Sequence, residues 1–384
     1  MKVLYDSLGF LEPQGGVSRY FTELIRHLPP DVRWEIAADE TYNAFLREPP
    51  FSVPEARHSI RAFWPGFHFR GKSVVYRTLA RLGVYPSMEL ANERRFAAAL
   101  KKGDFDVLHL TGPHGCGTAW RKYAGSAKVV MTVHDLIPDM WWKGFRGDRV
   151  RRQRRYDVEH VDAIIAVSEN TKRDLMRLYG VAEEKITVIH HGYGGRTLPD
   201  GVAGTGNYVL FVGKRGGYKN FSWFVRELAP LMREQPELRL VCTGGGFDAG
   251  ERKLLDDLGM LDRAEARFVD DGELRQLYAQ AACFVYPSRY EGFGIPILEA
   301  FAARCPVVLS EASCFPEVGG DAALYFRLDD GEGLRRAVRA ATGGRRDKLV
   351  AKGLERVKGF TWNACAEKTM TVYAEAMTAP EEDA

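Results

Sequence analysis

Short apolar runs alternate with longer segments of helical periodicity along almost the whole chain. Apolar runs bounded by Gly, Pro, Asp or Ser are typical of buried strands, and strands that alternate with helices form parallel sheets from βαβ units. The expected strands are KVLYD, RWEIAA, DVLHLT, KVVMTVHD, AIIAVS and ITVIHH in the first half, and YVLFVG, LRLVCTG, ARFV, CFVYPS, PVVLS and ALYF in the second. The pattern predicts an α/β protein with two parallel sheets.

The boundary between two domains is expected in a Gly-rich segment. Residues 192–207, GYGGRTLPDGVAGTGN, are rich in turn formers and poor in large apolar residues. A chain of 384 residues also favours two domains, because single cores stop growing near about 250–300 residues. We therefore expect an N-terminal domain over residues 1–191, a linker over 192–207 and a C-terminal domain over 208–360.

The segment Tyr286–Ala303 carries the most informative chemistry. A strand-like run leads into a loop with Gly292 and Gly294, and an Ala-rich helix follows. Free N–H groups at a helix N-terminus bind anions, and glycines let a phosphate approach the backbone. Glu291 in the loop and Glu299 early in the helix suit a ligand that also carries hydroxyls. The segment therefore predicts a site for a nucleotide sugar.

This segment resembles a known family. Glu291 and Glu299 form an E-x7-E pattern within EGFGIPILEA, followed by PVVLS and FPEVGGDAALYF. The pattern is similar to that of the retaining glycosyltransferases of family 4, which include bacterial mannosyltransferases of surface polysaccharide synthesis. The resemblance runs from GGVSRYFTEL to the FTW motif and is weak only between Asp39 and Leu90. It implies the GT-B fold: two Rossmann-like, doubly wound domains facing across a cleft, with residues 361–384 forming a helix and tail that return to the first domain.

The resemblance also implies roles for single residues. Glu299 would bind the ribose hydroxyls, and Glu291 would bind hydroxyls of the transferred sugar. Val269 lies where the family meets the nucleobase, largely through backbone groups. The remaining residues expected to bind the donor are Gly15, Gly16, Gly292, Phe293, Gly294 and Ile295.

Cations for the leaving diphosphate follow the strand YVLFVG. Negative charge that develops on a leaving group must be stabilised by a metal or by fixed cations. By the family pattern Arg215 and Lys219 match best, with Lys214 as a substitute and a solvated basic loop as the alternative. The single D-x-D, residues 104–106, leads into a strand, and no Cys/His cluster has metal spacing. We therefore expect no metal.

Two further sites in the first half follow strands. The family's glycine loop, which closes over the donor phosphate, matches Gly15 and Gly16. His134 ends the strand VVMTVHD and would lie by the transferring sugar, although a hydrogen-bonded core histidine is the alternative. Asp135 can cap the following turn, and Ser168 has the features of a helix N-cap.

Composition limits the partners and the compartment. The net charge is only +3, which gives no nucleic-acid signature. Residues 1–200 carry 30 Lys and Arg against 24 Asp and Glu, and residues 201–384 carry 24 against 27, so the first half could meet an anionic partner. Six cysteines without a CxxC pair, a start directly in a strand, and no apolar run of the roughly 20 residues that span a bilayer favour a cytoplasmic protein.

One stretch in the first half suggests a partner. Residues 61–86 mix arginines and a lysine with aromatic residues and contain no acid. Such a segment can lie on an anionic bilayer at the inner face of the membrane. The alternative is that its aromatic side chains pack onto the first domain or line an acceptor groove.

We therefore expect a retaining, metal-independent hexosyltransferase that needs no cofactor. The donor is a nucleotide-diphosphate sugar, with GDP-mannose favoured over a UDP-hexose, and the acceptor is a saccharide or lipid-linked saccharide. A sugar-nucleotide epimerase, a phosphorylase and a non-catalytic nucleotide-binding protein remain as alternatives. A Rossmann dehydrogenase is excluded, because no strand leads into G-x-G-x-x-G.

Overall fold

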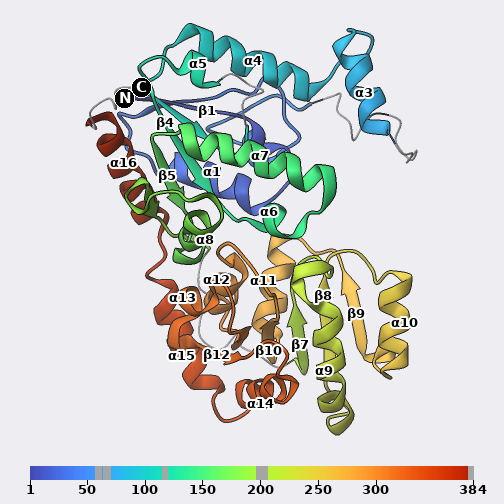
Figure 1. Cartoon of the computed structure of the whole chain (residues 1–384). Coiled ribbons are helices and arrows are strands. Elements are labelled where there is room, and N and C mark those ends of the chain that lie inside the picture. Colours follow the sequence, from blue (N-terminus) through green and yellow to red (C-terminus); the bar gives the residue numbers. More distant parts are fainter. Residues whose placement is uncertain (57–62, 64–70, 115–119, 196–205, 379–384) are drawn as a thin grey trace. The chain divides into compact units, whose positions relative to one another are not determined.

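The chain divides into two compact α/β units (Figure 1). The computed structural model describes residues 1–56, 63, 71–114, 120–195 and 206–378. Unit 1 comprises Met1–Val167, Lys172–Ile189 and Trp362–Ala384, and unit 2 comprises Ser168–Thr171 and His190–Thr361. Most of the expected linker, residues 196–205, lies outside the described residues.

The sheet of unit 1 has six parallel strands in the order β2-β1-β3-β4-β5-β6. They are β1 Lys2–Tyr5, β2 Arg33–Ile36, β3 Val107–Leu110, β4 Lys128–Val133, β5 Ala163–Ala166 and β6 Ile186–Val188. The helices that accompany them are α1 Gly16–Arg26, α2 Ala44–Arg47, α3 Lys72–Arg81, α4 Met88–Lys102, α5 Trp120–Ala124, α6 Ile137–Trp141, α7 Gly144–His160, α8 Glu169–Tyr179 and α16 Trp362–Thr378.

The sheet of unit 2 repeats this design in the order β12-β11-β10-β7-β8-β9. Its strands are β7 Tyr208–Phe211, β8 Arg239–Thr243, β9 Ala264–Arg267, β10 Cys283–Tyr286, β11 Val307–Ser310 and β12 Ala323–Phe326. Its helices are α9 Phe221–Glu234, α10 Ala249–Asp257, α11 Asp271–Gln280, α12 Ile295–Ala302, α13 Phe315–Gly319, α14 Gly331–Thr342 and α15 Arg346–Val357. A strand forms at each of the twelve predicted places, although the one expected over ARFV, residues 266–269, lies two residues earlier, at Ala264–Arg267. Both units have the doubly wound α/β fold expected from the sequence.

Strands buried on both faces explain the apolar runs. Along β1, Val3 and Tyr5 belong to the core cluster that includes residues of α1 and α16, whereas Leu4 belongs to the cluster on the other face with residues of α4 and α5. Successive side chains of a strand point to opposite faces, so helices on both faces require apolar residues at every position.

The last helix, α16, packs within unit 1 beside α1, β4 and β5 (Figure 1). Its Tyr373 hydroxyl lies 2.6 Å from Nδ1 of His109 and 3.0 Å from the hydroxyl of Tyr5, and all three side chains are buried. A polar network inside a core fixes one arrangement, because each buried group needs its partner. The network therefore holds α16 in register on the sheet.

Each sheet has a point at which the order of strands reverses. In unit 1 this point lies between β1 and β3, and in unit 2 it lies between β7 and β10. Loops leave the carboxyl ends of such neighbouring strands in opposite directions and open a crevice where ligands bind in doubly wound sheets. Residues that follow these four strands are therefore the first candidates for a site.

None of the described helices is long and apolar enough to cross a membrane.

Candidate functional site

The switch point of unit 2 brings together a lysine and a glutamate. Lys219 follows β7 and Glu291 follows β10, and Nζ of Lys219 lies 2.7 Å from Oε1 of Glu291. Both side chains are largely buried: 12% of the Lys219 side chain and 10% of the Glu291 side chain are exposed. The two residues follow neighbouring strands of the sheet, so a ligand bound at this switch point would meet a cation and a carboxylate at once.

Contacts at the end of β7 hold Lys219 in place. Its Nζ donates a hydrogen bond to the Tyr286 hydroxyl at 3.0 Å and passes close to Gly213, where a Cβ would lie 3.7 Å away. Burial, with the Glu291 carboxylate, raises the pKa of Tyr286 well above its usual range, so the hydroxyl stays neutral. The backbone N–H of Arg289 donates to the Tyr218 carbonyl at 2.7 Å, which ties the loops after β7 and β10 together.

The loop that carries Glu291 is fixed through its backbone. The Ser313 hydroxyl accepts from the N–H of Glu291 and donates to its carbonyl. Cys314 Sγ lies 3.1 Å from the carbonyl of Phe293. Gly294 caps α12 with φ 95°, and a Cβ there would lie 3.1 Å from Ile297 Cδ1. The fold itself therefore requires glycine at position 294.

Glu299 lies in α12, as the sequence predicted, and faces a buried tyrosine. The Tyr278 hydroxyl donates to Oε2 of Glu299 at 3.3 Å. Burial raises the pKa of Tyr278 well above its usual range, and Glu299 adds to the effect. The tyrosine therefore stays a neutral donor that can orient the carboxylate.

Arg215, which follows β7, binds the protein through most of its guanidinium group. Its Nε donates to Glu251 at 3.0 Å, and its terminal nitrogens donate to the carbonyls of Thr243, Gly245 and Gly246. These contacts use most of the five N–H donors of a guanidinium. The structure thus brings Lys219 together with Glu291, whereas the side chain of Arg215 binds the loop after β8.

Gly292 and Phe293, in the loop before α12, contact residues at the points where the chain enters unit 2. The Phe293 ring stacks on His191 with ring centroids 4.7 Å apart, and the Gly292 carbonyl accepts a hydrogen bond from the Ser168 hydroxyl at 2.7 Å. Burial lowers the pKa of His191 to about 3, so the imidazole is neutral. Ser168 also accepts from the N–H of Thr171, which confirms its predicted role as the N-cap of α8.

The region expected to meet the nucleobase presents an exposed ring. Val269 is partly exposed, and the neighbouring Phe268 is 83% exposed at the carboxyl end of β9. A Cβ built on Gly245 would lie 3.5 Å from the Phe268 ring. Gly245, whose carbonyl accepts a hydrogen bond from Arg215, therefore lies beside the Phe268 ring.

In unit 1 the predicted residues lie at the ends of β1 and β4. Gly15 is the N-cap of α1 and Gly16 its first residue. His134 is half-buried and meets the rings of Tyr20 and Phe21 edge-on, at 4.8 and 5.5 Å between centroids. Asp135 accepts from the N–H of Ile137, so its predicted role in the turn is confirmed.

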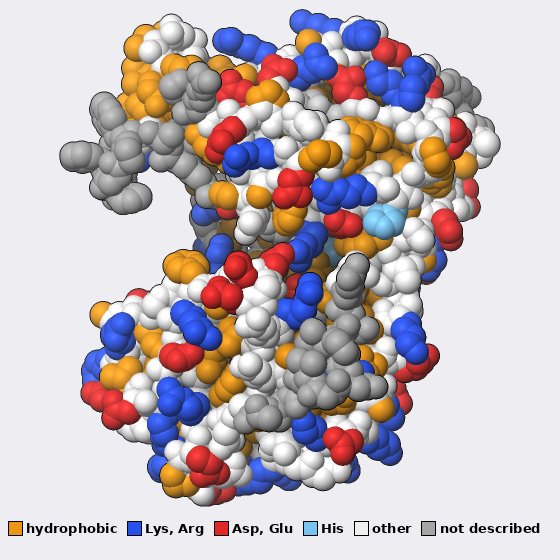
Figure 2. Space-filling model, turned by 180° about the vertical axis from the view of Figure 1, so that it is seen from behind, with side chains coloured by type: hydrophobic (Ala, Val, Ile, Leu, Met, Phe, Trp, Pro, Cys, Tyr) orange, Lys and Arg blue, Asp and Glu red, His pale blue; other side chains and the backbone are white. Residues whose placement is uncertain are grey.

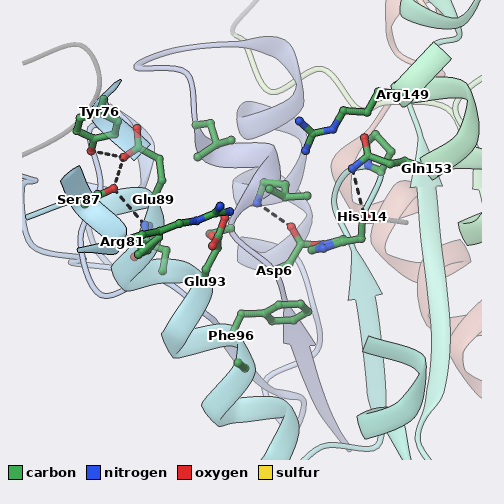
Figure 3. Close-up of a pocket in the computed structure, with 18 residues that line it drawn as sticks. Asp6, Tyr76, Arg81, Ser87, Glu89, Glu93, Phe96, His114, Arg149 and Gln153 are labelled. Carbon is green, nitrogen blue, oxygen red and sulfur yellow. Dashed lines mark hydrogen bonds and ion pairs between the residues drawn. The ribbon is translucent and has the colours of Figure 1, made fainter. Parts of the chain in front are cut away.

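A pocket of about 720 Å³ opens at the switch point of unit 1 (Figure 3). Asp6, directly after β1, and His114, in the loop after β3, form its floor, with Asp6 Oδ2 3.1 Å from Nε2 of His114. Burial opposes charge on His114, but the Asp6 carboxylate outweighs it and raises the pKa of the imidazole. Figure 3 shows Arg81 and Arg149 reaching toward this space from different helices.

Asp6, His114 and Tyr286 were not predicted from the sequence as site residues. Asp6 directly follows the first expected strand and Tyr286 lies in the strand CFVYPS, so carboxyl ends of strands were the available signal. Their pairing depends on strand order, which the sequence pattern alone does not specify.

No cluster of three or more potential metal ligands occurs among the described residues. On the face shown in Figure 2, basic and acidic side chains are interspersed over each unit rather than segregated by sign. The charge difference between the two halves of the sequence therefore does not produce a single large basic face in that view.

Comparisons with known proteins agree with this fold. The family model described as Glycosyltransferase Family 4 matches residues 14–193, and the model described as Glycosyl transferases group 1 matches residues 206–342. The O-antigen chain mannosyltransferase B of Escherichia coli is 28% identical over 97% of this chain and 99% of its own. Sucrose-phosphate synthase of Thermosynechococcus elongatus has a similar structure, with TM-score 0.70, 19% identity and coverage of 99% of this chain and 100% of its own. HepE of Anabaena, in complex with UDP and glucose, gives a TM-score of 0.69 at 15% identity, covering 97% of this chain and 99% of its own. The chain therefore belongs to the family-4 glycosyltransferases of GT-B fold.

Proposed function

We propose that the protein is a retaining, metal-independent hexosyltransferase that uses a nucleotide-diphosphate sugar, with GDP-mannose as the favoured donor. The observation that supports this most is the Lys219–Glu291 pair at the switch point of unit 2. A lysine can neutralise a phosphate as a point charge, and a carboxylate accepts hydrogen bonds from sugar hydroxyls. A site for phosphate alone would have no use for the carboxylate.

Each residue has one role in this proposal. Lys219 stabilises the diphosphate as the bond from the sugar C1 to the phosphate oxygen breaks. Glu291 binds hydroxyls of the transferred sugar, and Glu299 binds those of the ribose. Gly292, Phe293, Gly294 and Ile295 form the backbone cradle at the start of α12, where free N–H groups favour an anion.

Transfer with retention needs no protein nucleophile here. The acceptor oxygen forms its bond to C1 on the face that the phosphate leaves, and the departing phosphate oxygen takes the acceptor's proton. His134, at the carboxyl end of β4, positions the sugar or stabilises positive charge that develops on it. Fixed cations take the place of a metal in stabilising the leaving group.

Gly15 is proposed to meet the donor phosphate because the fold does not require glycine at this position. Its φ of −175° is open to any residue, and a Cβ would meet nothing closer than 3.9 Å. Glycine in such a place allows a ligand to approach the backbone closely.

The nucleobase is proposed to lie by Val269, where the exposed Phe268 ring offers a stacking face. Arg215 then acts as a positioning residue, because it binds the carbonyls of the adjacent loop. Direct contact of Arg215 with the diphosphate remains the alternative expected from the family pattern.

The acceptor is proposed to bind in the pocket of Figure 3 as a saccharide or the saccharide of a lipid-linked carrier. The pocket lies within the volume range of small-molecule sites, about 300–1,000 Å³. Its lining includes carboxylates, arginines and amides, which can exchange hydrogen bonds with many hydroxyls.

A panel of nucleotides and nucleotide sugars in a thermal-shift assay tests the donor. A ligand at 100 times its Kd stabilises the protein by about 2.7 kcal/mol, so GDP and GDP-mannose should shift the melting temperature more than UDP and UDP-hexoses. The similarity to a mannosyltransferase supports this order. A larger shift with the UDP series would make the UDP-hexose the donor, and no shift with any nucleotide would overturn the proposal.

Activity assays separate the remaining alternatives. Transfer should persist in EDTA, and NMR of the product should show the anomeric configuration of the donor. Activity that EDTA removes and Mg²⁺ or Mn²⁺ restores would contradict metal independence. Conversion of the donor without an acceptor product would indicate an epimerase.

A further inference from the structure

The segments that flank the pocket of unit 1 expose an unusual amount of apolar surface. Of the ten large apolar side chains exposed among the described residues, four lie in α3 and the turn after it and two lie at the junction of α6 and α7. They are Val74, Val75, Leu82 and Val84, and Trp141 and Phe145. Phe145 is 79% exposed and Leu82 is 70% exposed. Figure 2 shows hydrophobic side chains gathered over α3, at the upper left.

The same segments carry exposed cations. Arg81, Lys143, Arg146, Arg149 and Arg152 are exposed, and none of them forms an ion pair with another described residue. Arg146 instead stacks over the Trp142 ring at 3.8 Å. Residues 71–86 contain no acid, and the one acid of residues 141–152, Asp148, is paired with Arg151.

The two segments belong to one surface. Arg81 at the end of α3 and Arg149 in α7 line the same pocket, one from each side (Figure 3). We call residues 72–84 and 141–152 the pocket rim. It joins exposed apolar side chains to five exposed cations that form no ion pair with a described residue. Monomeric soluble proteins rarely expose large contiguous apolar patches without a function.

We propose that the pocket rim docks on an anionic lipid bilayer. Apolar side chains enter the boundary between headgroups and acyl chains, and arginines and lysines are attracted to anionic headgroups. Sequence reasoning placed such a surface in residues 61–86; residues 57–62 and 64–70 lie outside the described structure, and residues 141–152 were not foreseen. Docking would turn the pocket mouth to the membrane, which, on the proposed function, suits a lipid-linked acceptor.

Cosedimentation with vesicles tests the docking. The protein should sediment with vesicles of phosphatidylcholine and phosphatidylglycerol at low salt, less at high salt, and not with phosphatidylcholine alone. The variant Lys143→Glu/Arg146→Glu/Arg152→Glu should bind about tenfold more weakly or worse. The variant Val74→Ser/Leu82→Ser/Phe145→Ser should also bind more weakly but keep its salt dependence.

A matched control carries the same change in charge on unit 2. Arg226→Glu/Arg233→Glu/Lys348→Glu alters exposed cations outside the rim and should bind vesicles like the parent. Melting temperature and GDP binding show that each variant is folded. Docking is overturned if the parent does not sediment with anionic vesicles at low salt, or if the control loses as much binding as the rim variant. Glycosyl transfer to a soluble saccharide acceptor is scored separately, so loss of docking does not count against the proposed activity.

Discussion

Nζ of Lys219 lies 2.7 Å from Oε1 of Glu291, across the switch point of the second sheet. The pair fixes the position of the ammonium group. In the proposed function, a phosphate that binds Lys219 would compete with Glu291 and would free the carboxylate to accept hydrogen bonds from the sugar. We therefore expect binding of the diphosphate and binding of the sugar to be linked through this ion pair.

Replacement of Lys219 should affect both nucleotide binding and turnover. We expect Lys219→Met to weaken GDP binding and to lower kcat/KM by about 10²–10³, because a fixed charge on the leaving group is lost. Glu291→Ala should reduce turnover more than GDP binding, since its partner is the sugar. Calorimetry with GDP and initial rates with the donor separate the two effects; parental values for both variants would refute the site.

Replacement of Glu299 tests whether its carboxylate binds the ribose of the nucleotide. Glu299→Ala should weaken binding of GDP by about 1.5–3 kcal/mol, the range for hydrogen bonds to a charged group. Tyr278→Phe removes only the hydroxyl that contacts Glu299 and should have a smaller effect. If Glu299→Ala binds GDP as the parent does, the carboxylate does not contact the ribose.

Arg215 and Glu251 distinguish a positioning role from a direct contact. If Arg215 shapes the loop beside Phe268, then Arg215→Ala and Glu251→Gln should both raise KM and lower the melting temperature of the protein. If Arg215 stabilises the diphosphate directly, Arg215→Ala should cost about 3 kcal/mol in kcat/KM, and Glu251→Gln should stay close to the parent. Steady-state kinetics and thermal melts of both variants decide between these outcomes.

Two glycines should respond differently to alanine. Gly15→Ala should keep the parental melting temperature, because the backbone and the space around it admit a methyl group, but should weaken use of the donor. Gly294→Ala should destabilise the protein by about 1 kcal/mol or more, because φ is 95° there and Ile297 is 3.1 Å from the new methyl. Equal activity of Gly15→Ala and the parent would remove the proposed phosphate contact.

Acid should destabilise the protein through its buried neutral histidines. Burial lowers the pKa of both His191 and His109 to about 3. Between pH 6.5 and that value the unfolded imidazoles take up protons and the folded ones do not, so the free energy of unfolding falls by about 1.4 kcal/mol per pH unit for each group. His191→Asn should remove the contribution of one imidazole to this pH dependence, about 1.4 kcal/mol per pH unit. Urea titrations between pH 7 and 5 measure it, and an unchanged slope would show that His191 is not responsible.

The strands and several local motifs could be predicted because their causes are local. Apolar runs such as VVMTV specify buried strands through side-chain burial alone, and Ser168 and Asp135 cap backbone groups within three residues of themselves. The pairing of Arg215 with Glu251 joins residues 36 positions apart, and no local pattern specifies such a partner.

The pocket of unit 1 was missed for a related reason. Asp6 and His114 follow two strands, β1 and β3, that are distant in the sequence and adjacent in the sheet. In the sequence, the cations of α7 contribute only to the overall charge balance. Whether a cation can bind a partner depends on its exposure and its ion pairs, and neither follows from composition. Lys219 and Glu291 could be predicted as candidates because their motifs resemble those of a family, and the structure pairs their side chains.

The network of Tyr373, His109 and Tyr5 has a consequence for biosynthesis. The ribosome completes the whole of the second unit before it adds Tyr373, the residue that closes hydrogen bonds deep within the first. Until then, one face of the first sheet lacks the cover of α16, and His109 and Tyr5 lack their Tyr373 partner. The first unit therefore departs from the usual order, in which N-terminal domains fold first. The first unit can therefore complete this network only after Tyr373 has been synthesised.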